Sequence, residues 1–144
     1  MSINNFIYQN NIRPADAIIV KKAAGILDHY VIYLGIDEFN KHWFVANFKP
    51  KGVTLISEEE AFTFLQKYEP KRLNPFKGND LERNEAVKRA FDYPNDGYNL
   101  ILNNCEHFAN TVQHGVKFSG QSTAAMSVGA LLLVGLFAGI LSKD

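Results

Sequence analysis

Residues 98–112 read Y-N-L-I-L-N-N-C-E-H-F-A-N-T-V and contain the single cysteine of this 144-residue chain. The apolar run Tyr98 to Leu102 predicts a strand, and the asparagines after it open a helix from Asn104 to Val116. Cys105 is expected at the first turn, where the positive helix end and a neighbouring imidazole would lower the thiol pKa. The N–H groups of that turn predict an oxyanion hole. An inert buried cysteine is the alternative interpretation.

Four histidines are candidate bases for this thiol. His29 and His42 fall on predicted strands, from which a ring can face the N-terminus of the helix that begins near Cys105. His107 and His114 lie on that helix, and we expect them to be structural or surface residues. A cysteine with two separate histidines fits the pattern of nucleophile, base and orienting group. A metal site is disfavoured because paired ligand spacing is missing, and we expect no metal or cofactor.

The sequence before this segment predicts an α+β fold with an antiparallel sheet, because strands come first and helices mostly later. Ser57 and Glu60 form a capping-box pattern at the start of the first predicted helix. The stretch Lys67 to Asp80 contains two prolines and a glycine, which predicts a loop. The strands are expected at Ala17 to Lys22, His29 to Leu34, His42 to Phe48 and Val53 to Ile56, and the helices from Ser57 to about Lys67 and from Leu81 to Tyr93.

Composition excludes several classes of protein. Hydrophobic residues make up 47% of the chain, which excludes a disordered protein, and 15 basic residues balance 15 acidic ones. Neutral charge argues against a nucleic-acid partner. The polar start of the chain predicts no secretory signal, and one cysteine cannot form an intramolecular disulfide.

The C-terminal segment is apolar. Ala124 to Leu141 reads A-A-M-S-V-G-A-L-L-L-V-G-L-F-A-G-I-L, and a helix of this length spans roughly 27 Å. We therefore expect a folded domain at residues 1–120 and a transmembrane anchor helix at residues 122–142. Gly135 and Gly139 have the spacing that favours self-association of membrane helices. A buried core helix is the alternative.

Three motifs resemble the lecithin:retinol acyltransferase-like family, which includes a group of small phospholipase and acyltransferase tumour suppressors. They are N-C-E-H-F at Asn104 to Phe108, H-Y-V-I-Y-L-G at His29 to Gly35, and P-A-D at Pro14 to Asp16. Ala15 stands where the family usually has glycine, and residues 52–80 match the family only loosely.

The resemblance implies a permuted papain-like fold of the NlpC/P60 type, with Cys105 as nucleophile, His29 as general base and His42 as the orienting third member. In the family, the cysteine takes an acyl chain from a phospholipid as a thioester. Water then receives the chain in a phospholipase A reaction, or an amine or alcohol receives it in an acyltransferase reaction. The implied partner is a phospholipid membrane, and the implied location is a cytosol-facing domain with a tail anchor.

One departure concerns His42, since the sequence around it differs from the usual context of the second histidine. Because strand side chains alternate between faces, a change of one residue in the preceding loop would turn His42 away from the site. Asn47 is then the substitute orienting residue, as in papain.

Two other functions remain open: a cysteine peptidase or amidase of the NlpC/P60 type, and a non-catalytic, membrane-bound interaction module. N-P-F at Asn74 to Phe76 fits an adaptor-binding signal or a plain turn. Lys71, Arg72 and Lys77 fit contacts with lipid headgroups or a solvated loop.

Overall fold

The computed structural model describes residues 2–21, 28–49, 51–68, 70–93 and 104–116. Five strands and four helices are defined in these ranges, and the predicted α+β class is confirmed. They are α1 (Ile3–Gln9), β1 (Ala17–Lys21), β2 (Asp28–Ile36), β3 (His42–Phe48), β4 (Gly52–Ser57), α2 (Glu58–Lys67), β5 (Pro70–Asn74), α3 (Asp80–Asp92) and α4 (Cys105–His114).

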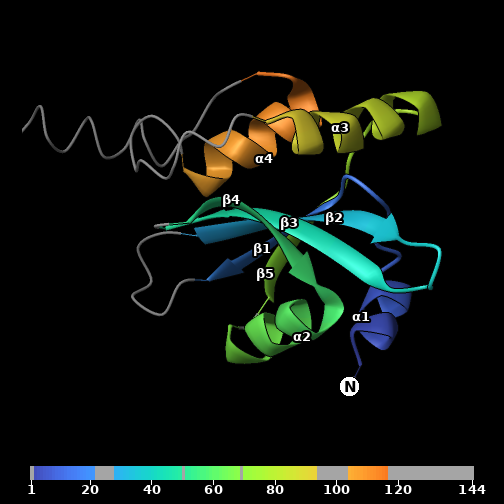
Figure 1. The fold of residues 1–144 in the computed structure, drawn as a ribbon, viewed down its shortest axis with the longest axis vertical. Helices are drawn as coiled ribbons and strands as arrows, with labels where there is room; N and C mark the ends of the chain where they lie inside the picture. Colours follow the sequence, from blue (N-terminus) through green and yellow to red (C-terminus); the bar gives the residue numbers. More distant parts are fainter. Residues whose placement is uncertain (1, 22–27, 50, 69, 94–103, 117–144) are drawn as a thin grey trace, which may run out of the picture.

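The strands form one antiparallel sheet in the order β4-β3-β2-β1-β5. Helices α3 and α4 cover one face of the sheet, and α1 and α2 lie on the other (Figure 1). The sheet is therefore the middle layer of three, and β2 is its central strand.

Alternation along β2 divides the core into two clusters, one on each face of the sheet. Tyr30 and Ile32 belong to the cluster that contains Cys105 and Phe108 of α4. Val31 and Tyr33 belong to the other cluster, which includes residues of α1 and α2. The face to which a β2 side chain points therefore decides which helices it meets.

The pairing of β2 with β3 shifts between Tyr33 and Gly35. Gly35 has a φ of +115°, a conformation that side-chain-bearing residues rarely adopt. A Cβ there would also lie 3.3 Å from the Pro14 ring. The glycine that ends the H-Y-V-I-Y-L-G motif is thus required by this bulge.

Polar side chains set the helix ends much as the sequence predicts. The Ser57–Glu60 capping box is formed in both directions, so this prediction is confirmed. Asn79 and Glu82 form a second capping box, which starts α3 one residue earlier than expected. At α4, Gly115 ends the helix with a φ of +71°.

The loop predicted from Lys67 to Asp80 is partly wrong, because Pro70–Asn74 pairs with β1 as the edge strand β5. A proline is tolerated at the first residue of an edge strand, where its missing N–H breaks no ladder. The N-P-F motif follows directly, and Phe76 is buried while its N–H donates to Asp16 Oδ1. This packing favours the turn interpretation of the motif over an adaptor signal.

Helix α1 was not expected from the asparagine-rich N-terminus. Ser2 caps it by accepting a hydrogen bond from the Asn5 N–H, and Ile3 and Ile7 are buried against the sheet. Its stability therefore comes from packing of one apolar stripe, a signal too short to recognise in seven residues.

The strand expected at Tyr98 to Leu102 and the anchor helix expected at residues 122–142 lie outside the described residues. Among the helices that are described, none has the length and apolar character needed to cross a bilayer.

Candidate active site

Cys105 is the first residue of α4 and is only 2% exposed. Its Sγ donates a hydrogen bond to the backbone oxygen of Asp28, at 3.3 Å. Asp28 is the residue directly before His29 at the start of β2. The structure therefore brings the candidate nucleophile against the strand that carries the candidate base.

The electrostatics of the thiol differ from the sequence-based expectation. Burial raises the pKa of Cys105 from 9.0 to about 11, because the interior disfavours the thiolate. Backbone N–H groups of Tyr30, Cys105 and Glu106 oppose this effect, and the Glu106 charge adds to it. The prediction of a lowered pKa is wrong for this arrangement, since desolvation outweighs the favourable helix end.

Two N–H groups of the first turn of α4, where an oxyanion hole was expected, already donate hydrogen bonds to a side chain of the protein. The Asn104 side chain accepts hydrogen bonds from the N–H groups of Glu106 and His107, at 3.0 and 2.9 Å. The Asn104 N–H in turn donates to His107 Nδ1. His107 is thus a buried residue of the helix cap, and His114 is exposed. Both positions agree with the expectation that these two histidines are structural or surface residues.

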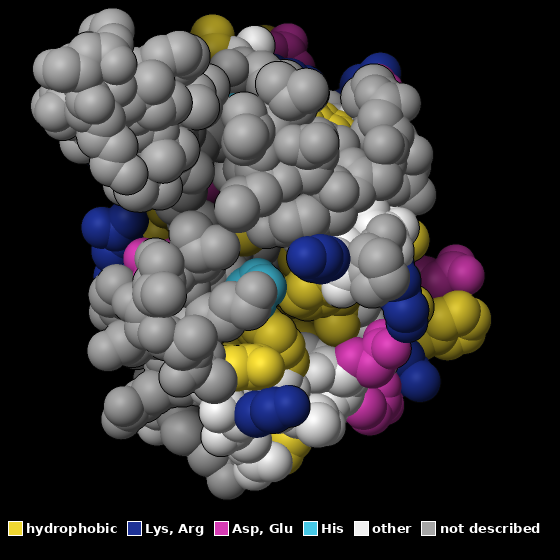
Figure 2. Space-filling view, turned by 90° about the vertical axis from the view of Figure 1, so that its left-hand side faces the viewer, with side chains coloured by type: hydrophobic (Ala, Val, Ile, Leu, Met, Phe, Trp, Pro, Cys, Tyr) yellow, Lys and Arg dark blue, Asp and Glu magenta, His cyan; other side chains and the backbone are white. Residues whose placement is uncertain are grey.

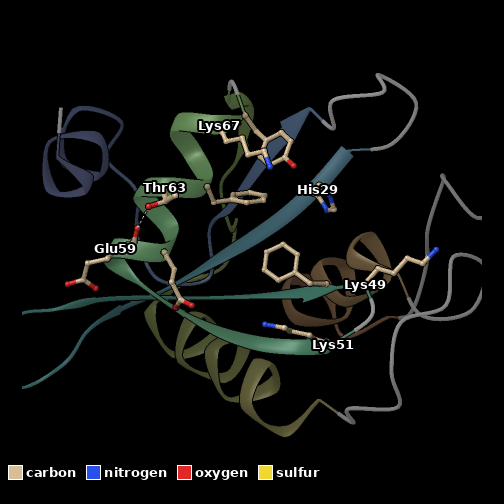
Figure 3. A pocket seen from close by; sticks show the side chains of 10 residues that line it. His29, Lys49, Lys51, Glu59, Thr63 and Lys67 are labelled. Atoms are coloured by element: carbon tan, nitrogen blue, oxygen red, sulfur yellow. Dashed lines mark hydrogen bonds between the residues drawn. The ribbon is translucent and has the colours of Figure 1, made fainter.

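His29 occupies the other face of β2 from the thiol. It shares the Val31 face, and its ring makes edge contacts with centroid distances of 6.0 to 6.3 Å. Figure 3 shows the ring at the end of β2, next to the space beneath α2. The contacting rings are those of Phe48, Phe64 and Tyr68.

His42 does not join this site, so its expected role beside His29 is corrected. It pairs with Ile36 at the far end of β2, seven residues from His29 or about 23 Å along the strand. Its Nδ1 is hydrogen-bonded to the Tyr33 hydroxyl at 2.7 Å, and its Nε2 to the Asn4 side chain of α1. The ring therefore links α1 to the sheet.

Asn47 lies closer to the candidate nucleophile. It is fully buried on β3, and its Nδ2 donates to the backbone oxygen of Asn104 at 3.4 Å. Asn104 is the residue before Cys105, so Asn47 touches the turn that presents the thiol. The sequence pointed to Asn47 through the alternation of side chains along this strand, which places His42 and Asn47 on opposite faces of the sheet.

Sequence reasoning missed a polar contact beside the thiol. The Tyr30 hydroxyl donates to Glu106 Oε1 at 3.2 Å, which ties β2 to the first turn of α4. Burial, followed by the charge of Glu106, raises the pKa of Tyr30 to about 12. A tyrosine in an apolar strand reads as a core residue, so no pattern in the sequence marks this contact.

An open groove of about 680 Å³ runs from His29 along α2. Phe48, Phe64 and Tyr68 line it with apolar surface, and Lys49, Lys51 and Lys67 lie at its edges. Figure 3 shows His29 and the three lysines among the side chains that line this groove. Within the described residues, no group of three or more His, Cys, Asp or Glu side chains is placed to hold a metal ion.

Two comparisons with known proteins agree with the motifs. The family model for lecithin retinol acyltransferase matches residues 10–118, which is more than half of the chain. Human phospholipase A and acyltransferase 2 is 41% identical over 64 residues, which cover 43% of this chain and 36% of that protein. The chain therefore spans well under two thirds of this curated relative. By the extent of the family match, the chain belongs to the lecithin retinol acyltransferase family.

Proposed function

We propose that this protein is a thiol enzyme that moves an acyl chain from a glycerophospholipid through a thioester on Cys105. Acceptance of the chain by water would make it a phospholipase A, and acceptance by an amine or alcohol an acyltransferase. The observation that carries the proposal is the position of Cys105 at the start of α4, bonded to the backbone next to His29. Family membership and the name of the human relative support the same chemistry.

In the proposed reaction, the His29 ring turns from the α2 side toward the thiol and takes the Sγ proton. The thiolate then attacks the carbonyl carbon of the lipid ester, and a C–S bond forms as the C–O bond breaks. The leaving alkoxide receives the proton from His29, which releases a lysophospholipid. Water, an amine or an alcohol next attacks the thioester, and its proton passes through His29 back to sulfur.

A base is necessary because burial keeps the thiol protonated at neutral pH. His29 is favoured over the other histidines because Asp28, its neighbour in the chain, already accepts the Sγ–H bond. The order of histidine strand before cysteine helix also supports a permuted papain-like fold of the NlpC/P60 type. A membrane is the proposed source of substrate, and a cytosol-facing domain held by the segment at residues 122–142 is the proposed arrangement.

The test is to incubate the full chain with phosphatidylcholine that carries a fluorescent acyl group. We expect a hydroxylamine-sensitive label on Cys105, absent in Cys105→Ser and reduced at least 100-fold in His29→Ala. His114→Ala is the matched control, since that histidine is exposed on the same helix. No thioester from any phospholipid would contradict the proposal, and release of a peptide or amide product would favour an amidase.

Asn47 is proposed as a positioning residue in this reaction, in place of His42. Asn47→Ala removes the bond to the Asn104 backbone and leaves the turn before Cys105 less fixed. We expect kcat to fall about 10-fold, with KM for the lipid within about 2-fold, because misplacement of a nucleophile slows chemistry more than binding. Asn47→Asp should not restore kcat, because a carboxylate cannot donate to the Asn104 oxygen. If the folded fraction of Asn47→Ala falls by the same factor as kcat, Asn47 has only a structural role.

A further inference from the structure

The groove beside His29 combines two kinds of surface. Figure 2 shows a face of the molecule on which hydrophobic side chains border a histidine, with Lys or Arg side chains close by. In the groove itself, Phe48, Phe64 and Tyr68 provide contiguous aromatic surface, with ring centroids 4.9 to 5.5 Å apart. An apolar floor of this kind offers a surface on which a hydrocarbon chain can be buried.

The charges at the edge of the groove come from different elements. Lys49 follows β3, Lys51 precedes β4 and Lys67 is the last residue of α2, and all three side chains are exposed. The Lys67 ammonium lies 5.5 Å from the centre of the Tyr68 ring. In Figure 3 Lys67 and Lys49 are seen on opposite sides of the His29 ring, and all three residues line the same groove.

Two glutamates, Glu59 and Glu60, also line the groove, so its lining contains three lysines and two carboxylates. A hydrogen bond from the Ser57 N–H in the capping box lowers the pKa of the Glu60 carboxyl, and the positive charge of Lys51 lowers it further. Figure 3 shows Glu59 at the opposite end of the groove from His29. Glu60 therefore offsets part of the Lys51 charge, and the three lysines still exceed the two glutamates by one positive charge.

From this arrangement we infer that the groove is a glycerophospholipid subsite, in which the aromatic floor takes an acyl chain and the lysines bind the headgroup phosphate. The inference rests on the proposed function and adds to it a preference for anionic phospholipids. Binding here places the lipid at the end of β2, where the Asp28 backbone contacts the candidate nucleophile. An ester between the chain and the phosphate would then lie at the strand end shared by His29 and Cys105.

Equilibrium binding tests the inference without turnover. The full chain carrying Cys105→Ser, in neutral detergent, is titrated with dihexanoyl phosphatidic acid by calorimetry. Dihexanoyl phosphatidylcholine and inorganic phosphate are the comparison probes. We expect the phosphatidic acid to bind at least 10-fold more tightly than either, because only it combines acyl chains with a strongly anionic phosphate.

The key variant replaces Lys49, Lys51 and Lys67 with glutamine. Each lysine is expected to contribute about five-fold to binding at low salt, so the triple variant should bind about 100-fold more weakly. The matched control replaces Lys41, Lys77 and Lys88, three lysines outside the groove lining, with glutamine and changes net charge equally. Phe64→Ala should weaken the phosphatidic acid and leave inorganic phosphate unaffected.

Several outcomes would overturn the inference. Equal losses in the two lysine variants would show general charge attraction, and equal binding of phosphate and phosphatidic acid would exclude the acyl chain from the groove. The proposed function fails separately, because absence of a Cys105 thioester in the wild-type chain leaves lipid binding in the groove unaffected. Loss of binding in the triple lysine variant with thioester formation intact in wild type supports both.

Discussion

At the scale of single residues, the buried thiol of Cys105 makes the most direct prediction. A pKa of about 11 in place of 9.0 lowers the thiolate fraction at pH 8 about 100-fold. Iodoacetamide should therefore alkylate Cys105 in the folded protein at least 100-fold more slowly than in urea. Mass spectrometry of the modified chain over time gives both rates. Similar rates in the two states would mean that the thiol is ionised or accessible in the folded protein.

The same thiol links stability to pH. Because its folded pKa is raised above the unfolded value, the thiol contributes stability that is present below about pH 9 and is lost as pH rises to about 11. We expect the stability of wild type relative to Cys105→Ser to fall by up to about 3 kcal/mol across this window. Urea unfolding of both proteins from pH 8 to pH 11 measures the difference. Tyr30 and Tyr33 titrate in both proteins, so their effects cancel.

The backbone conformation of Ala15 gives a third prediction at this scale. Its φ of +72° costs an alanine roughly 1–2 kcal/mol, yet its buried methyl contributes roughly 0.8 kcal/mol. Ala15→Gly should therefore leave the free energy of unfolding within about 1 kcal/mol of wild type, since glycine also loses more chain entropy. Ala15→Val should lower it by more than about 2 kcal/mol through strain and overpacking. Thermal unfolding of the pair separates backbone conformation from packing, and a tolerated valine would contradict the argument.

At the scale of elements, α1 depends on His42. His42→Ala removes the bonds to Tyr33 and Asn4 and leaves the hydroxyl of the buried Tyr33 without this partner, which should cost about 1–3 kcal/mol. Amide exchange in α1 should then accelerate more than exchange in α4. Acyl transfer per folded molecule should stay within about 2-fold of wild type, because the ring is far from Cys105. A near-complete loss of transfer would return His42 to the site.

The sequence predicts elements well where side-chain pattern and local capping agree. Apolar, β-branched runs mark β1, β2 and β3, and Ser57 with Glu60 marks the start of α2. The sequence-based prediction fails where tertiary contacts determine the secondary structure. The segment K-R-L-N is a strand because it forms backbone hydrogen bonds with the edge of β1. The placement of His42 likewise depends on the hairpin register and the bulge at Gly35, which a single sequence does not specify. Cys105 was identified by its motif, but burial of its thiol follows only from packing.

At the scale of the whole molecule, one buried ion pair connects the N-terminal segment to α3. Arg83 Nη1 lies 2.7 Å from Asp16 Oδ1, and both side chains are 8% exposed. Arg83 also donates to the backbone oxygens of Pro14 and Phe76. Asp16, from the P-A-D motif, therefore connects the N-terminal segment to Phe76 and to Arg83 of α3.

Removal of one partner should be costly because it leaves a buried charge without compensation. We expect Arg83→Met to lower the free energy of unfolding by about 3–5 kcal/mol. The double variant Asp16→Asn with Arg83→Met should lose less than the sum of the two single variants. Surface pair Lys88–Asp92 offers the control, since loss of this exposed pair should cost well under 1 kcal/mol. Additive losses at the buried site would show that the charges do not interact.

The central position of β2 has a consequence for how this protein can vary in evolution. One strand carries His29 toward the groove and Tyr30 toward the thiol, and the β-bulge at Gly35 shifts its pairing with β3 near the other end. An insertion or deletion of one residue between His29 and Gly35 would turn His29 and Tyr30 to the opposite faces of the sheet. The strand would then no longer carry His29 to the groove and Tyr30 to the thiol. The hairpin tip at residues 37–41, beyond the bulge, is free of this constraint. Length changes among relatives should therefore collect at the tip, while the seven-residue motif keeps its length.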